Sequence, residues 1–453
     1  MEIFYFNRAI ETASREDLAV HQLSRLRRLL KELLASNPFY GTRLRDAGFT
    51  DTRLLNSLED LKSFPFTSKS QLVEDQDTHP PFGTNLTFPL DQYTHLHQTS
   101  GTQGKPLRWL DTSESWDWWA RCWAAVYCAA GVTVADRIFF AFSFGPFIGF
   151  WGAWAGAEKI RALALSGGAH NSYQRLKTLI ELQATVLCCT PSYALHLAEV
   201  ARKENIDLDK SAVRKIIVAG EPGGSIPGTR ARIEEAWGAK VFDHTGATEI
   251  GAHGLTCLRQ SGVHLNEGEF LIEVINPLTL KPANEGELVI TNLDRIGSPV
   301  LRYRTGDHVR INQDACECGR AFARMDGGII GRIDQMLIVR GVNIFPSSLE
   351  SIVRSFPPVQ EFRVIVDDIN AMDELLITVE VDGDNPQDVV KAIGREASHR
   401  LGLRVGVELA AQPLHRFEMK ASRVIDKRPG ERSFISHKEH GLRRNGMPFK
   451  ENS

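Results

Sequence analysis

The sequence lacks the features that mark membrane-spanning, disulfide-rich and nucleic-acid-binding proteins. No run of about eighteen uninterrupted apolar residues occurs, so no membrane-spanning helix is expected. The 7 cysteines are an odd number in a chain of 453 residues, which argues against a disulfide framework and favours a reducing cytoplasm. The formal net charge is −3, so bulk electrostatic attraction to nucleic acid is not expected. The first residues also lack the basic and apolar regions of a secretory signal.

The G-x-x-x-x-G-K-[ST] pattern of P-loop nucleotide-binding proteins is also absent. A different loop, TSGTQGKP at residues 99–106, is rich in Gly, Ser and Thr. Such a loop offers backbone N–H groups and hydroxyls to a polyphosphate, and its lysine adds positive charge, although an ordinary surface loop has the same composition. The candidate phosphate-binding residues are Thr99, Ser100, Gly101, Thr102, Gly104 and Lys105.

The length of the chain predicts two or more domains, because one hydrophobic core rarely serves so many residues. Apolar periodicity predicts an N-terminal helical region interrupted at Asn37-Pro38, and then alternating strands and helices, which indicate a mostly parallel sheet covered by helices. The apolar stretch 138–157 is broken by glycines and reads as loop and buried core. Strands are expected at 137–141, 185–189, 215–219 and 240–243, and helices at 113–130, 191–203 and 226–237.

The pattern changes after Gly268, where strands follow one another without helices between them. A second unit starts after residue 332 and alternates short strands with two helices, at 346–355 and 386–401. The predicted fold class is therefore α/β: a large N-terminal domain of several subdomains, followed by a small α+β C-terminal domain.

Two further motifs carry chemistry. FDHTGATE at 242–249 begins at the end of a predicted strand, where open α/β sheets bind ligands. In it, Glu249 offers a hard oxygen ligand suited to Mg²⁺, and Thr248 offers a hydroxyl to a phosphate. YRTGD at 303–307 contains Asp307, which could accept hydrogen bonds from two ribose hydroxyls. A structural turn would explain either motif alone.

Taken in order, the motifs are more specific. Together with CCTPSYA at 188–194, AGEP at 219–222 and GRID at 331–334, they resemble the acyl-adenylate-forming ligase superfamily, in particular its phenylacetate–CoA ligase-like branch. The resemblance covers roughly Ile10 to Arg428. It implies an enzyme that uses ATP and Mg²⁺ to convert a small carboxylic acid to an acyl-AMP, and then transfers the acyl group to coenzyme A.

The resemblance also implies roles for individual residues. Lys420, in EMKASRV at 418–424, corresponds to the lysine that stabilises charge on the α-phosphate, with Thr248 and Glu249 as its catalytic companions. Asp307 and Arg332 would bind ribose, and Asp334 would be the hinge, in a segment 332–334 between domains 1–331 and 335–453. The residues expected around adenine are Gly220, Glu221, Pro222, Asp243, His244 and Thr245.

The sequence departs from the family pattern at Gln103, Thr245 and Met419, and between Phe142 and Trp151, where the acid should bind. The identity of the acid therefore stays open. Aromatic side chains gather in this segment and would suit a flat apolar acid, although ordinary core packing would use the same residues. The aromatic residues are Phe142, Phe144, Phe147, Phe150, Trp151 and Trp154.

Three thiols and one imidazole form a candidate zinc site: Cys257, His264, Cys316 and Cys318. Their spacing alone is a weak signal, because the two pairs are about fifty residues apart, but some phenylacetate–CoA ligase-like proteins carry zinc at this place. Unliganded core cysteines are the alternative, and His253 is an alternative ligand. With four protein ligands the site would be structural.

Other classes of function remain. The acyl group could be transferred to a carrier-protein phosphopantetheine or to an amine, since these enzymes share the adenylation step. A non-catalytic nucleotide-binding homologue is disfavoured by the presence of Glu249, Asp307 and Lys420 together. A zinc-stabilised interaction scaffold would not turn over ATP. A homodimer is an expectation from resemblance only.

Overall fold

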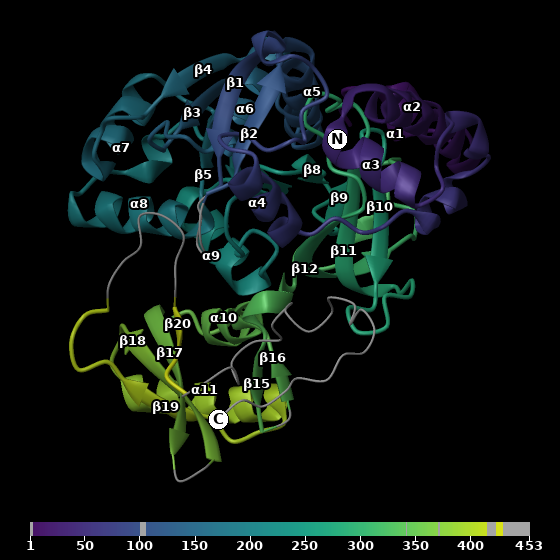
Figure 1. Ribbon diagram of the computed structural model, residues 1–453. Coiled ribbons are helices and arrows are strands. Elements are labelled where there is room, and N and C mark those ends of the chain that lie inside the picture. The colour runs from purple at the N-terminus through teal and green to yellow at the C-terminus, as the bar shows by residue number, and fades with distance from the viewer. Residues whose placement is uncertain (1–2, 100–105, 341, 370–371, 415–422, 429–453) are drawn as a thin grey trace, which may run out of the picture.

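The computed structural model describes residues 3–99, 106–340, 342–369, 372–414 and 423–428 (Figure 1). The proposed phosphate-loop residues 100–105 and Lys420 lie outside these ranges. Within them, no helix is both long and apolar enough to cross a membrane. The chain forms a large unit and a small unit, and the predicted α/β fold class is confirmed.

A sheet of 12 strands is the centre of the large unit. Its first half is parallel and consists of β3 (Arg137–Phe140), β4 (Leu163–Ser166), β5 (Val186–Cys189), β6 (Lys215–Val218) and the start of β7 (Lys240–Ala247). All four residues of β5 are buried, as expected for a parallel strand covered on both faces. The helices of this half are α5 (Ser113–Ala129), α6 (Ile148–Lys159), α7 (Ser172–Glu181), α8 (Pro191–Lys203) and α9 (Pro227–Trp237).

Helix α6 occupies most of the Gly-rich part of the stretch 138–157, where the sequence pattern indicates loop and buried core, so the helix there is not predicted. Its glycines allow close helix packing: a Cβ on Gly156 would lie only 2.3 Å from Cβ of Trp123, and a Cβ on Gly152 would lie 3.1 Å from the Trp119 ring. Because Gly152 and Gly156 are four residues apart, they face α5 together. The glycines that interrupt the apolar stretch in the sequence therefore form the contact surface of a helix.

Strand β7 is longer than predicted and joins the two halves of the sheet. It pairs with β6 in parallel up to Asp243 and with β8 in antiparallel fashion from His244 onward. The antiparallel half consists of β8 (Gly251–Thr256), β9 (Val263–Leu265), β10 (Phe270–Ile275), β11 (Glu285–Asn292), β12 (Tyr303–Asn312), β13 (Arg324–Met325) and β14 (Gly331–Arg332). The predicted sheet-edge motif at 242–249 thus lies largely inside a strand.

The N-terminal region packs against the antiparallel half (Figure 1). It contains α1 (Arg8–Glu11), α2 (Arg15–Ser36), α3 (Pro38–Asp46), α4 (Lys69–Thr78) and the hairpin β1 (Tyr93–Gln98) and β2 (Arg108–Thr112). The interruption predicted at Asn37 is present, because Asn37 ends α2 and its side chain caps α3 by accepting from the Tyr40 N–H. Apolar residues of α2 are buried in this contact.

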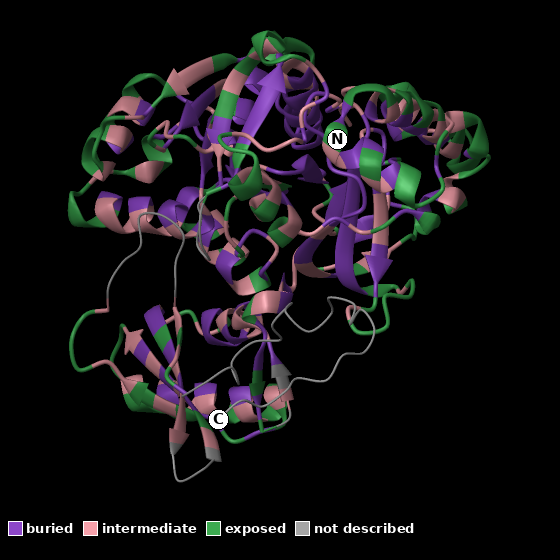
Figure 2. Ribbon diagram, viewed as in Figure 1, coloured by how far each residue is buried: buried purple, intermediate pink, exposed green. Residues whose placement is uncertain are grey.

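The small unit has its own hydrophobic core, and buried residues occur along its strands and helices (Figure 2). A four-stranded sheet of order β19-β18-β17-β20 is its centre. Its elements are β15 (Leu337–Val339), β16 (Val342–Ile344), α10 (Pro346–Arg354), β17 (Val359–Ile369), β18 (Met372–Val381), α11 (Pro386–Leu401), β19 (Gly406–Leu409) and β20 (Val424–Asp426). A separate core is what an independently moving domain requires.

A completely buried ion pair ties the large unit together. The side chains of Asp111 and Arg295 are both 0% exposed, and two hydrogen bonds of 2.7 and 2.6 Å join them. Arg295 also donates to the carbonyl of Thr248 at 2.6 Å and lies against the rings of Trp109 and Trp119. This arginine therefore links the β1–β2 hairpin, α5 and the turn that precedes Glu249.

Asp111→Asn should destabilise the protein strongly, because it leaves the Arg295 charge buried without a counterion. We expect a loss of about 3–5 kcal/mol in the free energy of unfolding, measured by urea denaturation. The matched control is Asp51→Asn, whose partner Arg53 is 89% exposed, and it should give no measurable change. Equal stability of Asp111→Asn and the wild type would contradict the assigned importance of this pair.

Candidate functional site

The loops that follow β5, β6 and β7 meet at the carboxyl edge of the parallel strands. The carboxylate of Glu221, after β6, accepts a 2.8 Å hydrogen bond from the backbone N–H of Ser192, in the first turn of α8. The hydroxyl of Ser225 donates to Asp243 of β7. Gly224 is required here, because a Cβ would lie 2.5 Å from Val218 and 2.8 Å from Asp243. This edge is where open α/β sheets bind ligands.

Of the residues expected near adenine, Asp243, His244 and Thr245 are buried, whereas Gly220 and Pro222 are exposed. Burial raises the pKa of Asp243 to about 6, although its hydrogen bond from Ser225 opposes the shift. Burial also lowers the pKa of His244 to about 4, so its imidazole is neutral at pH 7. The His244 ring lies 4.2 Å from the Trp123 ring, and its Nδ1 donates to the Gly254 carbonyl at 2.7 Å. Within the described structure, the buried hydroxyl of Thr245 has no hydrogen-bond partner.

The Thr248–Glu249 turn follows β7 and contains a buried carboxylate. Glu249 forms an ion pair with Lys69, at 3.1 Å between Oε1 and Nζ. Lys69 is the first residue of α4, whose N-terminus is fixed by a capping box between Ser68 and Gln71. The sequence did not predict a role for Lys69: the capping signal is present, but no pattern connects α4 with a turn 180 residues away.

Asp307 and Arg332 lie opposite each other in the pairing of β12 with β14. Arg332 Nη1 is 3.1 Å from Asp307, and its Nε and Nη2 donate to Asp334 at 2.9 and 3.0 Å. Burial raises the pKa of Asp307 to about 6, in spite of the opposing charge of Arg332. Glycine is favoured at 306, because the backbone has a φ of 75° there, in the left-handed region that L side chains rarely adopt. The expected ribose and hinge residues are thus in direct contact through one arginine.

The two ends of the expected phosphate loop are held by the β1–β2 hairpin. The hydroxyl and the backbone N–H of Thr99 close this hairpin: Leu107 N–H donates to Thr99 Oγ1 at 3.0 Å, and Thr99 N–H donates to the Leu107 carbonyl at 3.0 Å. In the small unit, Arg423 follows Lys420 by three positions and donates to Glu361 at 2.7 Å. The described residues therefore fix the flanks of both segments.

The aromatic residues proposed for the acid site lie together, between the end of β3 and α6. The rings of Phe142 and Phe150 stack at 3.4 Å between centroids, and Phe144 contacts the rings of Trp151 and Trp154 at 4.8 and 5.6 Å. Trp151 remains 41% exposed. The cluster presents an apolar surface next to the carboxyl edge of β3.

Cys257, His264, Cys316 and Cys318 are buried, and their ligand atoms all lie within 4.8 Å of one another. The Sγ atoms of Cys257 and Cys316 are 3.8 Å apart, and Cys318 Sγ is 3.4 Å from His264 Nε2. Tetrahedral zinc with Zn–S bonds of about 2.3 Å would give sulfur–sulfur distances of about 3.8 Å. The other His264 nitrogen, Nδ1, donates to the Phe322 carbonyl at 3.0 Å, which leaves Nε2 free for a metal. The cluster does not include His253.

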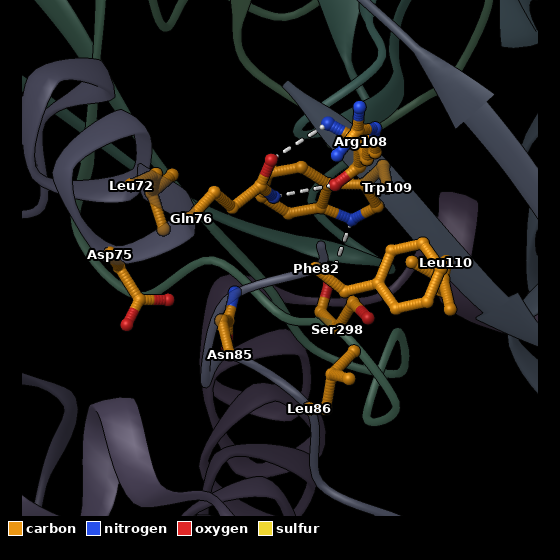
Figure 3. A pocket seen from close by; sticks show the side chains of 10 residues that line it. All are labelled: Leu72, Asp75, Gln76, Phe82, Asn85, Leu86, Arg108, Trp109, Leu110 and Ser298. Carbon is orange, nitrogen blue, oxygen red and sulfur yellow. Dashed lines mark hydrogen bonds between the residues drawn. The ribbon is translucent and has the colours of Figure 1, made fainter. Parts of the chain in front are cut away.

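A small pocket elsewhere in the large unit carries no comparable chemistry (Figure 3). It lies between α4, β2 and the 82–86 segment, and the hydroxyl of Ser298 is the one buried polar side-chain atom of its lining without a hydrogen-bond partner among the described residues. Gln76 exchanges hydrogen bonds with the backbone of Arg108, and Trp109 Nε1 donates to the Ser298 carbonyl at 3.0 Å. The pocket is therefore a packing feature and lies outside the candidate site.

The fold, a large α/β unit followed by a small α+β unit, is that of an adenylate-forming ligase. Residues 341–428 match the AMP-binding enzyme C-terminal domain family. The phenylacetate–coenzyme A ligase of Thermus thermophilus is 34% identical over 405 residues, which cover 86% of this chain and 88% of that protein. The Escherichia coli phenylacetate–coenzyme A ligase is 31% identical, and the match covers 92% of this chain and 97% of that protein.

Solved structures of 2-hydroxyisobutyryl-CoA ligase are also similar. In its postadenylation state, with a bound acyl-AMP, that enzyme gives a TM-score of 0.88 at 32% identity, over 93% of this chain and 92% of that chain. In its thioesterification state the TM-score is 0.70 at 33% identity, over 94% and 93%. The chain belongs to the phenylacetate–CoA ligase-like branch of the acyl-adenylate-forming superfamily, and is an AMP-forming acid:CoA ligase.

Binding of the nucleoside should depend on the ionisation of Asp307. Ribose hydroxyls donate hydrogen bonds, so they require the carboxylate, and burial raises the pKa of Asp307 to about 6. The affinity for adenosine, which carries no titrating phosphate, should fall as the pH falls through about 6, as measured by calorimetry between about pH 5 and pH 8. The stability of the unliganded protein should change in the opposite direction. Because the pKa of Asp307 is about 6 in the folded protein and about 4 when unfolded, its contribution to the free energy of unfolding falls as the pH rises from about 4 to about 6.

The comparison that decides this prediction is Asp307→Asn. This variant should bind adenosine more weakly at pH 8, and its affinity should depend less on pH. The pH dependence that remains should come from the titration of Asp243. An affinity profile identical to that of the wild type would exclude Asp307 from the nucleoside site.

Proposed function

We propose that this ligase activates a small, largely apolar carboxylic acid with ATP and Mg²⁺, and then forms its CoA thioester. The observation that carries the assignment of roles is that one short segment joins the two carboxylates. Thr67 exchanges backbone hydrogen bonds with Arg302 and Arg304, at the start of β12, the strand of Asp307, and Lys69 forms the ion pair with Glu249. In this proposal Asp307 and Arg332 bind ribose, and the loop at 220–222 borders adenine with Asp243, His244 and Thr245. Thr99 and residues 100–105 bind the triphosphate.

Adenylation begins when a carboxylate oxygen of the acid attacks the α-phosphorus of ATP. The bond to the bridging oxygen breaks and pyrophosphate leaves. Negative charge grows on the α-phosphoryl oxygens, and the ammonium group of Lys420 stabilises it in this proposal. Glu249 has the buried hard oxygen that suits Mg²⁺, which neutralises phosphate charge when it is bound. In the second step the CoA sulfur attacks the acyl carbon, AMP leaves with the carboxylate oxygen, and the thiol proton is released.

The acid is proposed to be an aryl or arylacetic acid, because the cluster of Phe142, Phe144 and Trp151 offers ring faces rather than charge. The similar proteins are named for acids as different as phenylacetate and 2-hydroxyisobutyrate. Transfer to a carrier protein or an amine is the second candidate, because it shares the adenylation step.

The decisive measurement is ATP–pyrophosphate exchange with aryl, arylacetic and small aliphatic acids, followed by a CoA-dependence assay. We expect exchange with the aromatic acids, and Glu249→Gln should lower it about a hundredfold or more, because the variant loses a charged ligand and keeps its size. Glu181→Gln, at the exposed end of α7, is the control and should behave as the wild type. Normal exchange by Glu249→Gln would remove Glu249 from the site, and exchange without thioester formation would favour the alternative acceptors.

A structural zinc is the second part of the proposal. The four protein donors leave no open position, and the distances between them fit a tetrahedral ion. The site connects the end of β8, strand β9 and the Cys316–Cys318 turn, in which Gly319 N–H donates to the Cys316 carbonyl at 2.8 Å. The zinc would thus join segments about fifty residues apart.

Purified protein should contain about one zinc per chain, as measured by elemental analysis. Cys318→Ser should lower both the zinc content and the melting temperature, because zinc binding is coupled to folding. Cys128→Ser is the matched control, since Cys128 is a free cysteine outside the cluster. Protein prepared without chelators that contains no zinc would contradict the site.

A further inference from the structure

The large and small units meet at a glycine. Gly228 lies in the first turn of α9, and the carboxyl end of α10 rests directly on it. A Cβ on Gly228 would lie 2.5 Å from the carbonyl oxygen of Arg354 and 2.8 Å from its carbonyl carbon. Both are backbone atoms of a helix end, so no side-chain rotation could make room. The two units can approach this closely only because residue 228 has no side chain.

Hydrogen bonds next to Gly228 hold the same part of the small unit. Arg232, one turn further along α9, donates from Nη1 to the carbonyl of Val359 at 2.6 Å. Arg354 is 3% exposed and donates to the Gln360 carbonyl at 2.8 Å and to Glu361 at 3.1 Å. Helix α9 therefore contacts the turn between α10 and β17, and the hydrogen bonds of Arg354 within the small unit fix the conformation of this turn.

This contact continues to the segment that contains the proposed adenylation lysine. Glu361, at the start of β17, accepts hydrogen bonds from Arg423 at 2.7 and 3.2 Å. Arg423 Nη1 also lies 3.7 Å from Glu350 of α10. The residue three positions after Lys420 is thus held, through Glu350 and Glu361, by α10 and the start of β17, next to the helix end that rests on α9.

The arrangement of the two units corresponds to one of two states seen in a relative. The TM-score is 0.88 against the postadenylation state of 2-hydroxyisobutyryl-CoA ligase and 0.70 against its thioesterification state, at nearly equal coverage. Because both values refer to the same enzyme, the difference reflects how its domains are arranged. The contact at Gly228 therefore belongs to the arrangement in which an acyl-AMP has been made.

We propose that Gly228 is a positioning residue for acyl-adenylate formation: it lets α10 dock on α9, and this docking holds Arg423, three positions after Lys420, against the large unit for the first half-reaction only. The inference rests on the proposed function, because it assumes that Lys420 acts in adenylation. Gly228 does not touch the substrate; it acts through α10, Glu361 and Arg423.

The test is Gly228→Ala, assayed in each half-reaction separately. Alanine forms helices better than glycine, so the melting temperature should stay the same or rise. Single-turnover acyl-AMP formation should fall roughly tenfold to a hundredfold, because the new methyl group keeps α10 away from α9. Thioester formation from supplied acyl-AMP should stay within about twofold of the wild type, because this step does not use the contact. Lys420→Ala provides the reference for a pure adenylation defect.

Gly394→Ala is the matched control, since Gly394 lies in α11 and a Cβ there would be 3.6 Å from Val407, an ordinary contact. It should leave both half-reactions unchanged. Arg232→Met is a second variant; it removes the hydrogen bond to Val359 and should lower adenylation in the same selective way, but less. If Gly228→Ala does not fold, Arg232→Met decides the question.

Three results would overturn the inference: normal adenylation by Gly228→Ala, equal loss of both half-reactions in a variant with a normal melting temperature, or normal adenylation by Arg232→Met where Gly228→Ala does not fold. Failure of the proposed function would look different. In that case the wild-type protein itself would form no acyl-AMP with any acid, so the failure would be seen without any variant.

Discussion

The Asp111–Arg295 ion pair is the constraint on which the rest of the site depends. Two charges with no exposed surface must be paired, and every donor of Arg295 that forms a hydrogen bond goes to Asp111 or to the Thr248 carbonyl. Asp111 lies in β2, which leaves the expected phosphate loop, and Thr248 precedes Glu249. The strand that follows the expected phosphate loop and the turn that contains Glu249 are therefore joined by one side chain, which belongs to none of the motifs.

Near this ion pair, the site contains buried polar groups that lack some of the hydrogen bonds or counterions that burial requires. Burial raises the pKa of both Asp243 and Asp307 to about 6, and the buried Thr245 hydroxyl has no partner among the described residues. Such groups lower the stability of a fold, and they are found together where a ligand is to supply the missing interactions. The hydrogen-bond donors of a nucleotide would supply these missing interactions.

Elements that depend on neighbouring residues alone could be predicted from the sequence. Helix α8 has the predicted bounds, because Thr190 caps it, Pro191 starts it and its apolar residues recur at helical spacing. The pair of Asp307 with Arg332 was expected from the resemblance. By contrast, α6 was missed because glycine is a poor helix former, and its packing against Trp123 is visible only in three dimensions. The ion pairs of Glu249 with Lys69 and of Asp111 with Arg295 join residues 180 or more positions apart, beyond any periodic pattern.

The connection between the two cores is a single 3₁₀ turn, Ile333–Gln335. A tether this short keeps the local concentration of the small unit around its docking surface very high, on the order of millimolar or more, so docking is an intramolecular equilibrium. A few contacts then suffice to populate the docked state, and the same few contacts are weak enough to release it. A large apolar interface would hold the small unit in one place, whereas a helix end resting on one glycine, with a single hydrogen bond from Arg232 beside it, suits docking that can be reversed.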